Sequence, residues 1–270
     1  MLKKIKEASN YISSKIGAKP VLGLILGTGL NSLTDILENS IEIPYKDIPH
    51  FRISTAPSHT GKLVFGKLYG KDVVFMQGRL HYYEGYSMQD ITFPIRVFAD
   101  LGIKTLMVTN AAGSLNPEYL PGDIVLLNNH INFMGNNPLI GKNYPELGER
   151  FPSMHEPYRL TLIEMAKNIA KENNFELKEG VYLAVAGPSL ETKAESLMLS
   201  KFGADLVGMS TVPEVIVAIH SRLNVMGISV VTNLSNIFHS NPHSQEEIRK
   251  NALKAKEKLQ KIILETIKKI

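Results

Sequence analysis

The chain has 270 residues, 44% of them hydrophobic, so it is long enough to bury a sizeable core. Its formal net charge is +4, and the excess lysines lie largely in two terminal segments with helical apolar spacing, 1–19 and 249–270. We interpret these lysines as solvated helix faces, and we expect no nucleic-acid partner. The absence of cysteine excludes disulfides, thiolate zinc sites and cysteine nucleophiles. Since no long apolar run or apolar signal region occurs, we expect a cytoplasmic protein with no membrane partner.

The domain organisation is simple. No linker rich in proline, glycine, serine or charge divides the chain, so we expect a single domain over residues 1–270. Strand-like and helix-like patterns follow each other along its length, which predicts an α/β fold with a twisted sheet flanked by helices. The longest stretch without periodicity, 134–157, is expected to be a functional loop.

The first strand is expected at 21–26, followed by Gly27, Thr28 and Gly29 and then by a helical pattern through 30–37. Strand, glycine turn and helix start in this order are typical of an anion cradle, in which Thr28 would donate its hydroxyl. A tight turn that needs the conformational freedom of glycine is the alternative interpretation. A dinucleotide fingerprint is excluded, because Ser32 stands where its third glycine belongs.

A hairpin is predicted next, because apolar runs at 62–68 and 73–76 flank four turn-forming residues, and it makes the sheet mixed. The second run ends just before Arg79 and His81, and open α/β sheets bind ligands at such strand ends. The guanidinium of Arg79 offers a planar fork that matches phosphate, and His81 adds a donor with a tunable charge. The sequence therefore predicts an oxyanion pocket here. His59, in the loop before the hairpin, is either a surface residue or a further ligand.

The remaining elements follow in chain order. Helices are expected at 88–101 and 157–172, and strands at 104–109, 123–127, 180–186, 205–207 and 224–232. Small residues at 110–117 follow the strand at 104–109, so a ligand can approach the backbone of Ala111 closely. A C-terminal helix capped by Ser244 would bury a stripe formed by Ile248, Leu259, Ile263 and Ile267.

Two helix starts match the capping box, in which a Ser or Thr and a Glu three residues later satisfy each other's backbone N–H groups. The pairs are Thr192 with Glu195 and Thr211 with Glu214. Glu191 precedes the first pair, where it either complements the helix dipole or faces a ligand at the strand end. No zinc-helix motif occurs, and we expect no metal site.

The polar groups at the predicted strand ends divide into two sets. Donors suited to phosphate come from Thr28, Arg79, His81, the Ala111 backbone and Ser210. Glu191 and Asn233 suit the edge of a heterocycle that bears N–H and C=O groups, because an amide donates and accepts at once. The sequence thus predicts a site with an anion half and a neutral-ring half.

Five long motifs, at 26–30, 76–86, 108–113, 186–192 and 207–214, occur in this order within residues 21–248. In them the sequence strongly resembles the trimeric purine nucleoside phosphorylases of the nucleoside phosphorylase fold. The resemblance implies phosphorolysis, in which a purine nucleoside and inorganic phosphate give the free base and ribose 1-phosphate. It also implies a homotrimer with phosphate as co-substrate and no metal or organic cofactor.

Matching positions carry the family's residue roles onto this chain. The resemblance implies phosphate binding by Thr28, His59, Arg79, His81, Ala111 and Ser210. It implies nucleoside contacts from Tyr83, Leu190, Glu191, Val207, Met209 and Asn233, and from Phe151 of a neighbouring subunit. Asn233, His81 and Glu191 would carry catalysis, and either Gln245 or His243 would reach the ribose 5′-hydroxyl. The chain has Thr28 where a serine is commoner, and Leu190 where an aromatic residue is usual.

The identity of residue 233 bears on the substrate. An asparagine can donate to N7 and to a 6-oxo group, whereas a 6-amino group favours a carboxylate. Asn233 therefore predicts inosine and guanosine over adenosine. The alternatives are a 5′-methylthioadenosine phosphorylase and a catalytically inactive nucleoside-binding relative.

Overall fold

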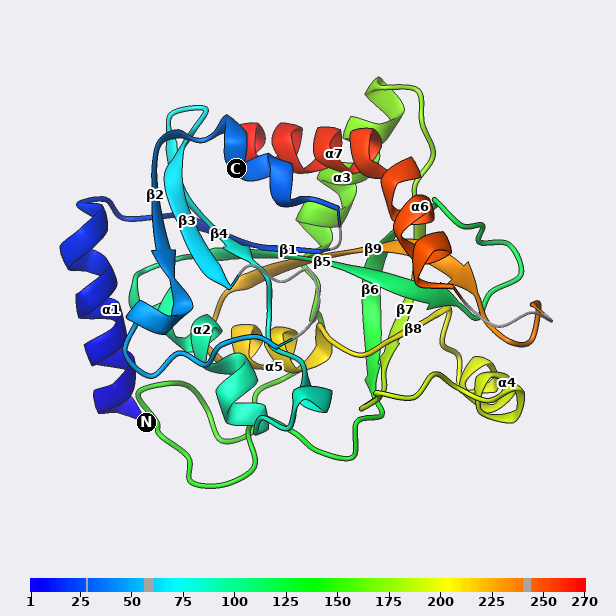
Figure 1. Ribbon diagram of the computed structural model, residues 1–270, viewed down its shortest axis with the longest axis horizontal. Coiled ribbons are helices and arrows are strands. Elements are labelled where there is room, and N and C mark those ends of the chain that lie inside the picture. The colour runs from blue at the N-terminus through cyan, green and yellow to red at the C-terminus, as the bar shows by residue number, and fades with distance from the viewer. Residues whose placement is uncertain (28, 56–60, 240–243) are drawn as a thin grey trace.

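The computed structural model describes residues 1–27, 29–55, 61–239 and 244–270. Its described strands form one mixed sheet in the order β2-β3-β4-β1-β5-β8-β7-β6-β9 (Figure 1). Their bounds are Leu22–Leu26 (β1), Glu38–Pro44 (β2), Lys62–Leu68 (β3), Lys71–Gln77 (β4), Thr105–Ser114 (β5), Ile124–Asn132 (β6), Lys178–Ala184 (β7), Leu206–Gly208 (β8) and Asn224–Leu234 (β9). The expected α/β class and mixed sheet are confirmed.

The sheet is closed along part of its width. β9 pairs with β6 on one side and with β5 on the other, so β5, β8, β7, β6 and β9 form a ring of paired strands. The remaining strands, β1 to β4, extend from β5 as an open sheet. The sequence patterns predict each ring strand but not the closure, which depends on pairings between segments far apart in the chain.

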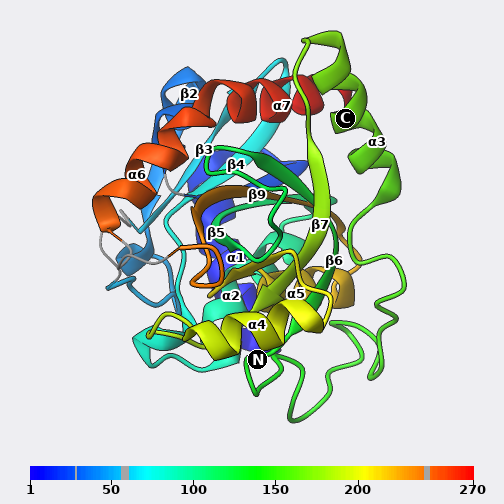
Figure 2. The same ribbon diagram turned by 90° about the vertical axis from the view of Figure 1, so that its right-hand side faces the viewer.

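Helices cover both faces of the sheet. Their bounds are Leu2–Ile16 (α1), Met88–Asp100 (α2), Leu160–Glu172 (α3), Lys193–Lys201 (α4), Val212–His220 (α5), Gln245–Lys254 (α6) and Lys256–Lys269 (α7). α3, α6 and α7 lie on one side of the central strands, and α2 and α5 lie on the other (Figures 1 and 2). α2 packs between α1 and α5, and α3 packs against α7. No helix within the described ranges is both long and apolar enough to cross a membrane.

The core lies along the central strands. The side chains of β1 are buried throughout, as is typical of a parallel strand covered on both faces. Ser87 caps the start of α2, because its hydroxyl accepts from the backbone N–H of Asp90, and the helix turns Ile95 and Phe98 into the core. β1, β4, β5 and β9 run parallel, and Leu26 pairs with Gln77. The carboxyl ends of these four strands therefore lie at the same end of the sheet.

Several predicted elements need correction. The segment 30–37 forms a 3-10 helix, Asn31–Ile36, instead of an α-helix, and β2 follows it without having been predicted. β2 is largely exposed and most of its residues are polar, so it lacks the apolar run that would have predicted a strand. The expected C-terminal helix is interrupted at Ala255, which separates α6 from α7. Residues 134–157 contain no helix or strand, as predicted.

The strand predicted at 104–109 is longer than expected. β5 continues through Ser114, so the small residues after Thr109 form strand and not the loop that the sequence suggests. Ala111 pairs with Val230 and Gly113 with Asn233 along β9. Residues 110–113 thereby become one wall of the functional site.

Candidate active site

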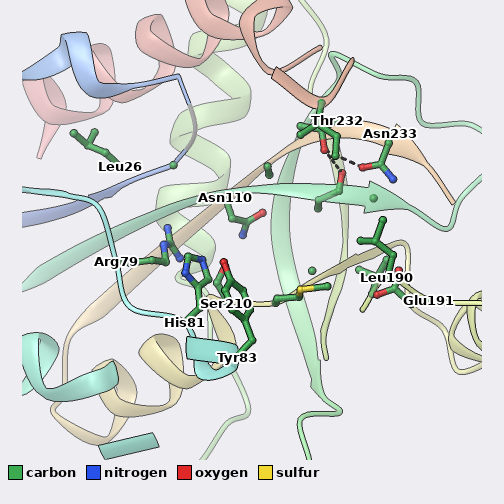
Figure 3. A pocket seen from close by; sticks show the side chains of 18 residues that line it. Leu26, Arg79, His81, Tyr83, Asn110, Leu190, Glu191, Ser210, Thr232 and Asn233 are labelled. Atoms are coloured by element: carbon green, nitrogen blue, oxygen red, sulfur yellow. Dashed lines mark hydrogen bonds between the residues drawn. The ribbon is translucent and has the colours of Figure 1, made fainter. Parts of the chain in front are cut away.

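A cavity of about 270 Å³ lies where the ends of β1, β4, β8 and β9 meet the continuation of β5. Many residues that the sequence analysis predicts for the site line it: Arg79, His81, Tyr83, Ala111, Leu190, Glu191, Val207, Met209, Ser210 and Asn233. In Figure 3, Arg79, His81 and Ser210 gather on one side, and Glu191 and Asn233 lie on the other. The predicted division into an anion half and a ring half therefore matches the arrangement of the side chains.

Other predicted site residues do not lie in this cavity or are not described. Thr28, His59 and His243 fall outside the described ranges. Gln245 is the first residue of α6, but its side chain also lies outside the described part of the chain. Phe151 lies on the long loop, apart from the residues that line the cavity, and its exposed fraction is 86%.

Arg79 is held from behind by a buried carboxylate. Its Nη1 lies 3.2 Å from Glu214 Oε1 and 3.3 Å from Thr211 Oγ1, and its Nη2 donates to the carbonyl of Thr109. Arg79 is 3% exposed and Glu214 is 4% exposed. A pair this deeply buried fixes the guanidinium plane in one orientation at the cavity wall.

The capping box predicted for Thr211 and Glu214 is therefore wrong. Thr211 makes no side-chain cap on α5, because its hydroxyl and the Glu214 carboxylate both serve Arg79 instead. The sequence pattern of a capping box cannot distinguish a carboxylate that turns back to its own helix from one that pairs with a distant arginine. The capping box of Thr192 and Glu195 on α4 is confirmed, with bonds in both directions.

Thr211 has an unusual backbone conformation. Its φ is 70° and its ψ is −56°, and the N–H of Val212 donates to the carbonyl of Ser210 at 2.7 Å. This geometry is a γ-turn with positive φ, which is rare and strained, above all for a β-branched residue. Strain of about 1–3 kcal/mol at one residue persists only where surrounding contacts enforce it, and such residues cluster at functional sites.

His81 is fixed by Glu84. Glu84 Oε1 accepts from the backbone N–H of His81 at 2.7 Å and lies 3.3 Å from the Nδ1 atom of the ring. Its Oε2 accepts from the N–H and the hydroxyl of Thr55. Burial raises the pKa of Glu84, but hydrogen bonds from Thr55 and His81 outweigh it, so this pKa lies below its usual value. One face of the His81 ring stacks on the ring of Tyr83, with the ring centroids 4.8 Å apart.

Asn233 is oriented by its neighbour in β9. The hydroxyl of Thr232 lies 3.0 Å from Asn233 Oδ1 and 3.3 Å from the carbonyl of Ala112 (Figure 3). The amide oxygen is the nearer of the two acceptors, and the NH₂ group donates one proton to the carbonyl of Leu234 at 3.4 Å, which leaves its second proton for an acceptor on a ligand. A Cβ atom at Gly113 would lie 3.1 Å from Asn233 Nδ2, so glycine leaves room for this amide.

Glu191 lies at the end of the loop between β7 and α4. Asn236 donates to its backbone carbonyl at 2.6 Å, which ties this loop to the segment after β9. The side chain is half-buried, and burial raises the pKa of its carboxyl above the usual value. The bond from Asn236 fixes the backbone next to the ring half of the cavity, so Glu191 is held there by more than its position at a helix start.

Two polar residues of the cavity were missed by the sequence analysis as ligands. Asn110 donates to Thr211 Oγ1 at 2.8 Å, while its buried Oδ1 has no hydrogen-bond partner within the described residues. Thr232 was seen only as the last residue of a strand. Both stand next to predicted site residues, Ala111 and Asn233, and that adjacency was the only available signal. The described residues contain no cluster of three His, Asp or Glu side chains that would hold a metal ion.

Comparisons with known proteins show which family the chain belongs to. A protein-family model described as the phosphorylase superfamily matches residues 21–268. Purine nucleoside phosphorylase 1 of Geobacillus stearothermophilus is 48% identical over 252 residues, which cover 93% of this chain and 92% of the relative.

Two solved structures are similar over nearly the whole chain. The purine nucleoside phosphorylase of Schistosoma mansoni in complex with inosine has a TM-score of 0.94 and 39% identity, covering 100% of this chain and 97% of that one. Isoform 2 from the same organism, in complex with cytosine and ribose-1-phosphate, has a TM-score of 0.95 and 42% identity, covering 99% and 96%. The chain therefore belongs to the purine nucleoside phosphorylases of the phosphorylase superfamily.

Proposed function

We propose that this chain cleaves the N-glycosidic bond of purine nucleosides with inorganic phosphate, giving the free base and ribose or deoxyribose 1-phosphate. The observation that carries the proposal is that one cavity has cationic and hydroxyl donors on one side and a carboxylate and an amide on the other. The inosine and ribose-1-phosphate complexes of the two Schistosoma mansoni relatives support the substrate and the product.

Phosphate binding is assigned to Arg79, His81, Ser210 and the backbone of Ala111, together with Thr28 and His59 from the undescribed segments. Arg79 already has a carboxylate partner in Glu214, so the guanidinium acts as a fixed fork rather than an unpaired charge. Glu84 holds His81 in place beside it. These groups position the nucleophile before reaction, which removes much of the entropic barrier.

Base binding is assigned to Glu191 and Asn233, with Val207 and Leu190 along the ring and with Tyr83 and Met209 against the sugar. As the glycosidic bond stretches, positive charge develops on the ribose and negative charge on the departing purine. The bound phosphate stabilises the ribose cation, and its oxygen forms the new bond to C1′. The Asn233 NH₂ group stabilises the purine anion, and one such oriented donor is worth about 3 kcal/mol of barrier.

The substrate preference follows from the orientation of Asn233. Because the Thr232 hydroxyl lies nearest to its Oδ1 and one amide proton goes to the Leu234 carbonyl, the amide presents its other N–H to the ring, which suits the acceptors N7 and O6 of inosine or guanosine. The 6-amino group of adenosine is itself a donor, so it would face the N–H of Asn233 without an acceptor between them. This disfavours adenosine and 5′-methylthioadenosine, and a nucleoside-binding relative without turnover would have no use for the anion half of the cavity.

The long loop gives a reason to propose an oligomer, and the family resemblance makes a homotrimer the expected one. Phe151 is 86% exposed, and Arg150 is its only described ring contact, with the guanidinium 5.8 Å from the ring centroid. We assign Phe151 to the sugar side of a neighbouring subunit's cavity, so assembly completes each site. Catalysis without a metal or organic cofactor and a cytoplasmic location stay predictions.

The proposal is tested by following hypoxanthine release from inosine. We expect release in phosphate buffer, none in a phosphate-free sulfonate buffer, and ribose 1-phosphate in equal amount to the base. Adenosine should be cleaved more slowly than inosine, and Asn233→Asp should shift the preference toward adenosine. Absence of any phosphate-dependent release from inosine or guanosine would refute the function, and faster cleavage of adenosine would refute the specificity.

A further inference from the structure

The hydroxyl of Ser210 lies between two other buried hydroxyl groups. Thr211 Oγ1 is 3.2 Å from Ser210 Oγ, and the phenol oxygen of Tyr182 accepts from the backbone N–H of Ser210 at 3.4 Å. Thr211 and Tyr182 are each 0% exposed. Each hydroxyl has one proton and two acceptor lone pairs, so the direction of every bond can be worked out by counting.

Thr211 has only one way to use its proton. Its Oγ1 accepts from Asn110 Nδ2 at 2.8 Å and from Arg79 Nη1 at 3.3 Å, and both of these nitrogens can only donate. The two lone pairs are therefore occupied. The Thr211 proton must go to the remaining neighbour, so Thr211 donates to Ser210 Oγ.

The contacts of Tyr182 also make Ser210 Oγ a hydrogen-bond acceptor. Its oxygen accepts from the backbone N–H of Ser210 at 3.4 Å, no other side chain or carbonyl of the described residues accepts the phenol proton, and the Ser210 hydroxyl is the acceptor that we assign to it. Burial raises the pKa of Tyr182 to about 12, which keeps the phenol protonated and able to donate. Ser210 Oγ then accepts twice and keeps a single proton that neither neighbour can take.

We propose that Thr211 and Tyr182 are positioning residues that force the Ser210 proton into the anion half of the cavity, where it is donated to phosphate. The inference rests on the proposed function, because it takes phosphate as the anion at Ser210. Without these neighbours the Ser210 hydroxyl rotates, and in some orientations it presents lone pairs to the phosphate oxygens. With them, Ser210 is a committed donor before the anion arrives, so no reorientation accompanies binding.

Two backbone features fit this role. The strained γ-turn at Thr211 brings its side chain back beneath Ser210, beside Arg79 and Asn110. At Gly208, a Cβ atom would lie 2.2 Å from the Tyr182 oxygen, so only glycine lets the phenol reach Ser210. Both features place a hydroxyl at Ser210, and neither is explained by the packing of apolar side chains.

The test compares Thr211→Val, Thr211→Ser and Tyr182→Phe, with KM measured separately for phosphate and for inosine. We expect Thr211→Val to raise the KM for phosphate about 10-fold, and Tyr182→Phe to raise it about 3-fold, because each removes one hydrogen bond that orients a donor to an anion. Thr211→Ser should stay near wild type, and the KM for inosine should change little. Tyr119→Phe is the matched control, since this buried phenol donates to the carbonyl of Glu179 outside the cavity.

Combination with Ser210→Ala separates positioning from general packing. If Thr211 and Tyr182 act through Ser210, Tyr182→Phe has no further effect on the KM for phosphate once Ser210 is alanine, and Thr211→Val has a reduced one. A Tyr182→Phe effect of the same size in both backgrounds would overturn the inference, as would a wild-type KM for phosphate in both Thr211→Val and Tyr182→Phe. Circular dichroism reports folding, and if Thr211→Val does not fold, the Tyr182→Phe pair decides.

A binding measurement distinguishes failure of this inference from failure of the proposed function. If the wild-type chain releases no base from any purine nucleoside, phosphate binding to the free protein is measured by calorimetry. Weaker binding to Tyr182→Phe than to wild type and Tyr119→Phe supports the inference even then. Equal phosphate affinity in all three, or no binding to wild type, refutes it.

Discussion

Arg79 and Glu214 form a buried ion pair directly behind the anion half of the cavity, with 3.2 Å between Nη1 and Oε1. The pair joins the segment after β4 to the first turn of α5, which lie far apart in the sequence. Its carboxylate balances a charge that the site needs, so stability and phosphate binding are linked through one residue.

Glu214→Gln should destabilise the protein strongly. Breaking a buried pair leaves an uncompensated guanidinium, which costs about 3 kcal/mol or more. Phosphate should restore part of the loss, because an anion next to Arg79 replaces the missing charge. The measurement is the free energy of unfolding in urea with and without phosphate. Glu164→Gln, at an exposed pair with Lys167, is the control and should change little. Equal stability of the two variants would contradict the prediction.

Glu191→Gln should lower activity while raising stability at neutral pH. Burial raises the pKa of this carboxyl, so the folded state holds the ionised form less readily than the unfolded state. Removing the charge is therefore stabilising above the folded pKa, and the gain disappears below the ordinary value of about 4.5, where both states are protonated. Urea unfolding at pH 7.5 and pH 4 measures the difference. A variant that is less stable than wild type at pH 7.5 would argue against the assigned burial.

Thr232→Val should lower kcat/KM for inosine about 10-fold, since the Asn233 amide loses the donor that fixes its oxygen. The KM for phosphate should remain near wild type, because the Thr232 hydroxyl bonds to none of the groups assigned to phosphate. Thr266→Val is a matched control: its hydroxyl is buried in α7 without a partner among the described residues. Loss of phosphate affinity in Thr232→Val would show that the two halves are not independent.

Phe151→Ala should leave the unfolding temperature unchanged and raise the KM for inosine, because the exposed ring supports no core but is assigned to a neighbouring site. Mixing it with Asn233→Ala, after dissociation and reassembly, should recover activity: a Phe151→Ala chain keeps its own cavity and receives Phe151 from its neighbour. Activity equal to the average of the separate variants would refute the shared site. Light scattering before mixing gives the number of subunits.

Much of the cavity was predictable from the sequence because its residues follow strands directly. Arg79 follows β4, Glu191 lies just before α4, and Asn233 lies at the end of β9, so short-range patterns locate them. The supporting residues were not predictable in this way. Glu214 and Thr211 fit a local capping motif, yet their partner is Arg79, and no short-range pattern reports such a contact.

The fold shows the same limit. The hairpin of β3 and β4 was predicted because its turn is local, and the structure confirms it. Closure of the strand ring was not, since β9 pairs with both β5 and β6 across long separations. The strand predicted at 104–109 ended too early because small residues are typical of loops. In the structure these residues extend β5 to the place where a ligand must come close.

The closed ring also determines how copies of this chain can associate. Since β9 is paired on both sides, β2 is the one free edge of the sheet within the described residues. That edge carries Glu38 and Glu42 and has an irregular register between Glu38 and Ile41. Charges and irregularity on an edge strand oppose the addition of a strand from another molecule. Ordered assembly of subunits should therefore use loops and helices, and should not proceed by extension of the sheet into fibres.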